Sequence, residues 1–168
     1  RLAIASAVLL LVAVIARVPF PRGAALQGAV ALGTLNFGIG LSSLYWGERR
    51  VPSGIAAMFY AAAPILAGLF AALLRVQRLD PIRMVAALIG LAGVALIFHG
   101  ELSLGAPFPP LAAVSLSVVC AALSTVLLKR APVHAVITVN AVATAIGSVV
   151  CFLGSVLLRE HRVFPATA

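Results

Sequence analysis

The sequence predicts an all-α fold, namely a polytopic membrane helix bundle with six transmembrane helices. The composition is the first reason: 63% of the 168 residues are hydrophobic and 10% are charged, with a mean hydropathy of +1.18. Soluble domains average about 25% charged residues. The second reason is that long apolar runs alternate with short segments rich in Pro, Gly or charge. A helix of ~20 apolar residues crosses a bilayer core of ~30 Å.

The placement of the charges is a third reason. Twelve Lys and Arg residues against four acidic ones give a net charge of +8, and they lie singly or in pairs at the ends of the apolar runs. Membrane anchoring places basic residues there, whereas a nucleic-acid groove needs them clustered on one face. We therefore expect the lipid bilayer as a partner and no nucleic acid.

The first apolar run, Leu2–Ala16, has 15 residues and would be ~22 Å long as a helix, which is shorter than a full span. Taken alone, it also fits the apolar part of a signal peptide. Because five further apolar runs follow, we favour a membrane helix that is cut at its beginning. The chain starts at Arg1 and ends at Ala168, soon after a helix, so we expect an internal fragment of a longer protein.

The second run, Ala25–Trp46, follows a turn of Pro and Gly residues at Val18–Gly23. It carries Asn36 near its centre, and it ends on Tyr45 and Trp46, at the usual headgroup position of aromatic rings. Small residues let helices approach closely in lipid. This run contains four of them as glycine, at Gly28, Gly33, Gly38 and Gly40.

The third and fourth runs, Val51–Leu74 and Met84–Phe98, are joined by a charged hinge, Arg75–Arg83. Pro64 lies near the middle of the third run, on the same expected helix face as Tyr60. The proline removes a backbone hydrogen bond, frees the carbonyl of Tyr60 and bends the helix. In a membrane this is tolerated where the carbonyl faces protein or a wet cavity. The pair is therefore predicted to line a cavity.

The last two runs are Leu111–Leu128 and Val133–Leu158, and the polar linker His99–Pro110 precedes them as the plausible repeat boundary. Alternate threading of six helices places seven basic residues on the side of the Arg75–Arg83 hinge and five on the other side. The positive-inside rule then predicts a cytoplasmic hinge and an external linker.

The third and fourth runs resemble the EamA-type repeat of the drug/metabolite transporter superfamily. The stretches that carry the resemblance are Ala61-Ala-Ala-Pro-Ile65, the small-residue continuation Leu66–Leu74, the charged turn, and Ala86-Ala-Leu-Ile-Gly-Leu-Ala-Gly-Val-Ala95. Leu111–Arg130 resembles the opening helix of a second repeat. Each motif is loose, but their order and spacing together are specific. The turn departs from the family, because it reads Gln77-Arg78 in place of Glu-Arg, so the acidic residue's pairing role is lost or moved to Asp80.

The resemblance implies that the chain covers the second to seventh of ten helices. Residues 1–98 would form the first EamA repeat without its first helix, 99–110 the linker, and 111–168 the start of the second repeat. A repeat of five helices inserts its second copy upside down. Inverted repeats hold the substrate near the midplane and give alternating access by rocking. The implied location is the inner (cytoplasmic) membrane of a bacterium.

No Asp, Glu, Lys, Arg or His lies in the interior of an apolar run. Intramembrane ionisable groups mark proton relays and ion sites, so we expect no proton relay, no metal site and no cofactor in this part. The sequence also lacks paired carboxylates, a metal-ligand cluster, or a Ser with a His at a plausible depth, which argues against an enzyme. His99, His134 and His161 lie at helix ends, where a solvated histidine is expected.

Uncharged polar groups at depth remain, together with the proline, and the substrate-cavity candidates are Asn36, Tyr60, Pro64, Ser117, Asn140 and Thr144. An amide in hydrocarbon must find a partner, which for Asn36 is either a neighbouring helix or the solute. The alternative role is core packing for Tyr60, bonding to its own helix for Ser117, and helix–helix contact for Asn140 and Thr144. The residues expected to serve helix packing are Gly33, Gly68, Gly90 and Gly93.

Two functions fit these observations. The first is a membrane transporter (a permease or exporter) of small organic metabolites by alternating access. Its cavity without fixed charge would suit neutral, zwitterionic or amphipathic solutes. The alternative is a non-transporting membrane interaction subunit, or a partner of a larger carrier. Both functions are compatible with a homodimer.

Overall fold

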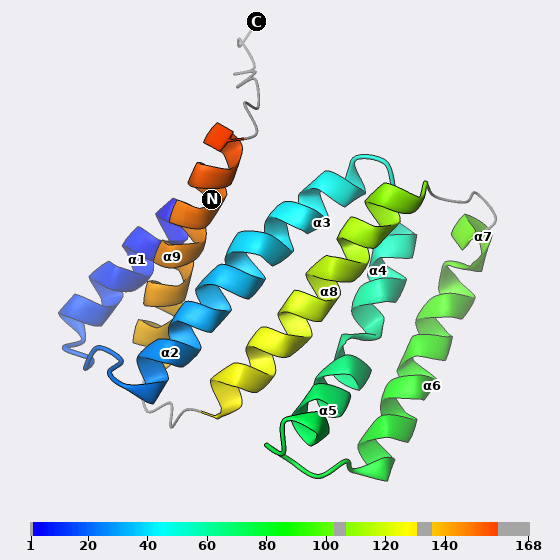
Figure 1. Ribbon diagram of the computed structural model, residues 1–168, viewed down its shortest axis with the longest axis horizontal. Helices are drawn as coiled ribbons and strands as arrows, with labels where there is room; N and C mark the ends of the chain where they lie inside the picture. The colour runs from blue at the N-terminus through cyan, green and yellow to red at the C-terminus, as the bar shows by residue number, and fades with distance from the viewer. Residues whose placement is uncertain (1, 103–106, 131–135, 158–168) are drawn as a thin grey trace, which may run out of the picture.

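The computed structural model describes residues 2–102, 107–130 and 136–157, and throughout these ranges the regular secondary structure is helical (Figure 1). The predicted all-α fold is confirmed. The elements are α1 (Leu2–Ile15), α2 (Ala24–Ala31), the π-helix η1 (Leu32–Gly40), α3 (Leu41–Glu48), α4 (Ser53–Ala61), α5 (Ala63–Leu73), α6 (Pro81–Ile97), α7 (His99–Leu102), α8 (Phe108–Lys129) and α9 (Val136–Leu157). Predictions that involve Arg1, His134, or the charged residues Arg159, Glu160, His161 and Arg162 lie outside the described residues.

Each of the six predicted apolar runs is mainly helical in the residues that the structure describes, but the lengths of the helices differ. Four helical stretches are long and apolar enough to cross a membrane: Ala24–Glu48, Ser53–Leu73, Phe108–Lys129 and Val136–Gly154. Helices α1 and α6 are apolar but shorter, with 14 and 17 residues. The predicted linker also differs, since it contains α7, and α8 begins within it at Phe108.

The helices pack side by side as one layer, in an order that differs from the order in the sequence. Figure 1 shows α1, then α9, then α2–η1–α3, then α8, then α4–α5, and last α6, and each of these neighbours is in contact. The two C-terminal helices therefore insert between helices of the N-terminal part. The N-terminal and C-terminal parts form a single interlocked bundle.

The connections divide between the two ends of the layer. The α1–α2 and α5–α6 connections lie at the same end as the C-terminus of α8, and the α3–α4 connection lies at the opposite end (Figure 1). The first end therefore gathers the described basic residues that the threading assigned to one side: Arg17, Arg22, Arg75, Arg78, Arg83, Lys129 and Arg130. The opposite end carries Arg49 and Arg50.

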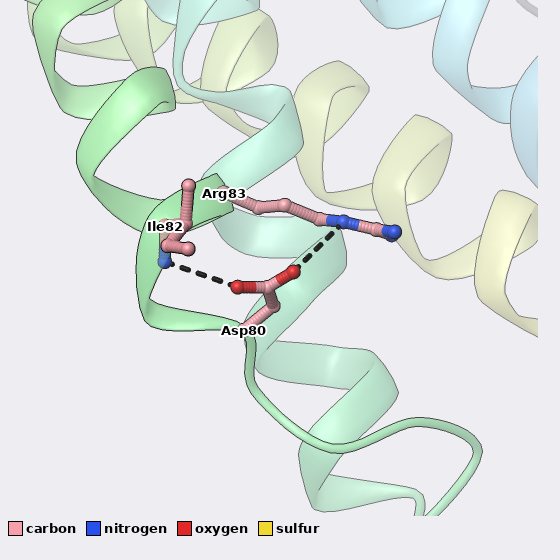
Figure 2. Close-up of polar contacts among 3 residues, drawn as sticks. All are labelled: Asp80, Ile82 and Arg83. Atoms are coloured by element: carbon pink, nitrogen blue, oxygen red, sulfur yellow. Dashed lines mark hydrogen bonds and ion pairs between the residues drawn. The ribbon is translucent and has the colours of Figure 1, made fainter.

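Asp80 starts α6. Its carboxylate accepts a hydrogen bond from the backbone N–H of Ile82 at 3.0 Å and pairs with the Nε of Arg83 at 3.1 Å (Figure 2). Asp is a preferred N-cap, and Pro81 follows at the first helical position, where the missing N–H costs nothing. Both charged side chains are exposed enough that the ion pair itself contributes little. An acidic residue at this hinge thus begins the helix.

A compact core lies near the end that carries Arg49. Val51, Ile55, Ala56, Met58 and Val114 are buried together, and residues of α3, α6 and α8 pack around them. This core fixes α4 against α8. By contrast, α6 buries none of its residues, and its large apolar side chains are mostly exposed.

Candidate functional site

The π-helix η1 occupies the centre of the second span, between α8 and α9. It has nine residues, three of which are glycines. A Cβ at Gly33 would lie 2.6 Å from the carbonyl oxygen of Ala143, and one at Gly38 would lie 2.6 Å from Cγ1 of Val150. Only hydrogen atoms fit there, because both distances are shorter than van der Waals contact. The glycines therefore let η1 press against α9.

The return from π-helix to α-helix leaves one carbonyl without a backbone donor. At the end of η1, backbone N–H groups donate to the carbonyls of Asn36 and Gly38, but not to the carbonyl of Phe37 between them. The thiol of Cys151 on α9 donates to this carbonyl, with 3.3 Å between sulfur and oxygen. The neighbouring helix thus satisfies the polar group that the irregular backbone exposes, as a membrane interior requires.

Asn36 lies at the middle of η1, and its side chain is half-buried. Throughout the described parts of the chain, its carboxamide has no hydrogen-bond partner, and it is not fully enclosed by protein. An unsatisfied amide at this depth costs ~1–3 kcal/mol. Because π-helical segments are rare and are frequent at functional sites, Asn36 is the candidate that the structure makes most distinctive.

The span that carries Pro64 is broken. A turn at Ala62, with φ −80° and ψ −10°, ends α4, and Pro64 lies in the first turn of α5. Tyr60 and Pro64 therefore belong to different helices, which corrects the expectation of one bent helix. The amide of Ala62 donates to the carbonyl of Phe59 at 3.1 Å, and the carbonyls of Phe59 and Tyr60 both accept at this helix end. A tighter local turn thus satisfies the carbonyl that we expected to be free.

Three of the other polar candidates bond to their own helices. The hydroxyl of Ser117 donates to the carbonyl of Val114 at 2.6 Å, and that of Thr144 to the carbonyl of Asn140 at 2.8 Å. The amide of Asn140 donates to the carbonyl of Val136 at 3.0 Å. Ser117 lies on α8, and Asn140 and Thr144 lie on α9. Both helices contact η1, but these three residues do not line the groove described below. Their role in a cavity stays a prediction.

The four glycines named for packing have different surroundings. Gly33 packs as described above, and a Cβ at Gly68 would lie 3.3 Å from the sulfur of Met84 on α6. Gly90 and Gly93 are exposed, with no atom of the described residues within 4 Å of a Cβ placed there. Gly147 was not among the glycines expected to serve packing, but its backbone lies directly against Phe37 of η1.

A groove of about 1150 Å³ runs between α1, α3 and α9 in the half of the layer that carries Arg49. None of the six predicted cavity residues lines it. The lining residues are Leu2, Ala3, Ala5, Leu41, Ser42, Ser43, Tyr45, Trp46, Arg49, Ala113, Ser148, Cys151, Phe152 and Gly154. Of these, the sequence singled out Tyr45 and Trp46, as headgroup anchors. Within the described residues, no group of three His, Cys, Asp or Glu side chains is placed to hold a metal ion.

A search of curated proteins and of solved structures gives no match. The sequence model of the EamA-like transporter family matches residues 1–99, more than half of the 168 residues. These residues include α1, the interrupted spans with Asn36 and Pro64, and α6. The chain therefore belongs to the EamA-like transporter family, a family of membrane transporters in the drug/metabolite transporter superfamily.

Proposed function

We propose that this transporter carries small organic metabolites across the membrane by alternating access, and that Asn36 is a solute-binding group. One observation carries the proposal. Asn36 is a mid-span carboxamide, half-buried and without a partner in the described residues, in the π-helical part of a membrane span. A carboxamide offers two donors and one acceptor. A bound solute can supply the hydrogen bonds that the protein leaves open.

The substrate class follows from the charge of the spans. The apolar runs contain no Asp, Glu, Lys, Arg or His in their interior, so a solute held there meets amide, hydroxyl, thiol and aromatic groups. Desolvating a multivalent ion without a compensating charge is expensive. Neutral, zwitterionic or amphipathic solutes fit this environment best, and both a permease and an exporter are consistent with it.

The experiment compares Asn36→Ala with Asn140→Ala. Both variants remove an amide from a membrane span, but the amide of Asn140 already bonds to the carbonyl of Val136 in its own helix. The purified protein is reconstituted in vesicles, and flux is measured for a panel of radiolabelled neutral and zwitterionic amino acids, with inorganic phosphate as the anionic control. We expect Asn36→Ala to reduce flux at least tenfold at equal amounts of folded protein, and Asn140→Ala to leave it within about twofold.

The same experiment can contradict the proposal. An equal loss of flux and of folded protein in Asn36→Ala would make Asn36 a packing residue. Unchanged flux in that variant, beside measurable flux in the wild type, would remove Asn36 from the site and leave the family assignment intact.

A second function, a non-transporting membrane interaction subunit, is favoured by the surface of α6. This helix buries none of its residues, and Gly90 and Gly93 lie open on it. Small residues of this kind allow a second helix, including one from another copy of the chain, to approach closely. Solute flux by the purified chain, in vesicles that contain no other protein, would reject this function. Absence of flux together with crosslinking of Gly90→Cys to a partner would favour it.

A further inference from the structure

The groove between α1, α3 and α9 has an apolar body and a charged end. Its walls include Leu2 of α1, Leu41 of α3 and Phe152 of α9. At one end, Tyr45 and Trp46 are followed after one helical turn by Arg49, which is the only formally charged residue among the described residues that line the groove. A charge at one end and mostly apolar surface along the rest, with Ser42, Ser43 and Ser148 as its hydroxyl groups, is the polarity of an amphiphile that stands parallel to the helices.

Short side chains explain why the protein itself does not fill this space. Seven of the fourteen lining residues are Ala, Ser or Gly. A Cβ added at Gly154 would meet no atom of the described residues within 4 Å, so these residues leave the wall open at this point. An apolar space of this size would be costly to leave as a void or to fill with water. In a bilayer, it is available to lipid.

The charged end is not neutralised by any residue that the structure describes. Arg49 is exposed and has no ion-pair partner among the residues that the structure describes. A guanidinium binds phosphate through two parallel hydrogen bonds. Tyr45 and Trp46 are 54% and 44% exposed, and such rings lie at the headgroup level of a membrane. Arg49 is therefore at the depth where the phosphates of lipids are found.

We propose that this groove binds an anionic phospholipid, with its phosphate on Arg49 and an acyl chain along α1 and α9. The site is separate from Asn36, which does not line the groove, so the proposal stands whether or not Asn36 binds solute. Charge complementarity selects the occupant: an anionic headgroup matches the unpaired arginine, and the acyl chain matches the apolar walls.

The protein carries its own reporter for the test, because Trp46 is its single tryptophan and lines the groove. The chain is reconstituted in phosphatidylcholine vesicles that contain a small, fixed fraction of either brominated phosphatidylglycerol or brominated phosphatidylcholine. Bromine on the upper part of an acyl chain quenches tryptophan fluorescence on contact. We expect the anionic lipid to bind about fivefold more strongly, the ratio that one arginine near an anionic surface provides.

Two pairs of variants distinguish the contribution of the lipid headgroup from that of its acyl chain. Arg49→Gln should abolish the preference for the anionic lipid, whereas Arg50→Gln, whose side chain does not line the groove, should keep it. Gly154→Leu should lower quenching by both lipids because it fills the groove, and Gly90→Leu, on exposed α6, is its control. Circular dichroism checks that each variant is folded.

Equal quenching of the wild type by the two lipids would overturn the proposal. So would an anionic preference that Arg49→Gln leaves intact. A quenching that Gly154→Leu does not lower, in folded protein, would show that the lipid contacts Trp46 from outside the groove and would overturn the proposal as well.

Discussion

Two spans of this chain are interrupted, and they accommodate the interruption in opposite ways. In the span Ala24–Glu48, the backbone widens into η1, and in Ser53–Leu73 it breaks at Ala62 before Pro64. The first interruption lies between two neighbouring helices, and the thiol of Cys151 donates a hydrogen bond to the carbonyl of Phe37, which has no backbone donor. The second is satisfied locally, since the helix tightens and its own amides reach the carbonyls at the break.

The difference shows that the two spans depend on different parts of the protein. η1 depends on its neighbours, because its glycines admit the backbone of α9 and its free carbonyl needs a donor from that helix. The break at Pro64 depends on its own sequence, because proline lacks the N–H in any environment. Substitutions around η1 should therefore destabilise the bundle, whereas substitution of Pro64 should change movement more than stability.

The largest effect is expected for Gly33→Ala. Its Cβ would lie 2.6 Å from the carbonyl oxygen of Ala143 and 2.9 Å from the Cβ of Ile146, so the two helices must separate. Overpacking of this kind costs ~1–3 kcal/mol, and we expect the upper end because one of the atoms in contact is backbone. The free energy of unfolding in mixed micelles measures this loss.

Gly93→Ala is the matched control, because nothing in the described residues lies within 4 Å of its Cβ. Replacing Gly by Ala inside a helix gains up to ~1 kcal/mol when space allows. The two variants should thus differ in sign. If Gly93→Ala were as destabilising as Gly33→Ala, a neighbour would have to contact this face of α6. The loss of stability in Gly33→Ala could then not be assigned to the close packing of η1.

A smaller effect, on rate, is expected for Pro64→Ala. Alanine restores the N–H that can bond to the carbonyl of Tyr60, so α4 and α5 should join into one straight helix. Spin labels at Ser53 and Leu73, at the ends of the span, should then move apart. We expect solute flux to fall by about tenfold, equivalent to ~1.4 kcal/mol on the barrier. Pro109→Ala, in the first turn of α8, is the control, and unchanged flux in Pro64→Ala would refute a role for the break.

The sequence predicted these spans well because hydrophobicity and charge are local properties. The apolar runs, the hinge, and the positions of Asn36 and Pro64 within their spans were all visible in it. The π-helix was not, because its pitch depends on which helices its glycines meet. The groove was not either, since its walls come from helices far apart in the sequence. The open surroundings of Gly90 and Gly93 could not be predicted for the same reason. A small residue permits a close helix contact, but the tertiary structure determines whether another helix packs there.

The smallest effect is expected for Cys151→Ala, and it tests whether η1 depends on its neighbour through the thiol of Cys151, which lies 3.3 Å from the carbonyl oxygen of Phe37 and 3.7 Å from that of Gly38. Removing the thiol leaves the carbonyl of Phe37 without a donor, which should cost ~1 kcal/mol of unfolding free energy. Cys151→Ser keeps a donor and should recover most of the loss. Cys120→Ala is the control, because Cys120 is a buried thiol on α8 with no such bond to η1. Because a thiol is a weak donor, an equal loss in Cys151→Ala and Cys151→Ser would assign the cost to packing. The widened backbone would then be held by the fit of its glycines against α9 alone.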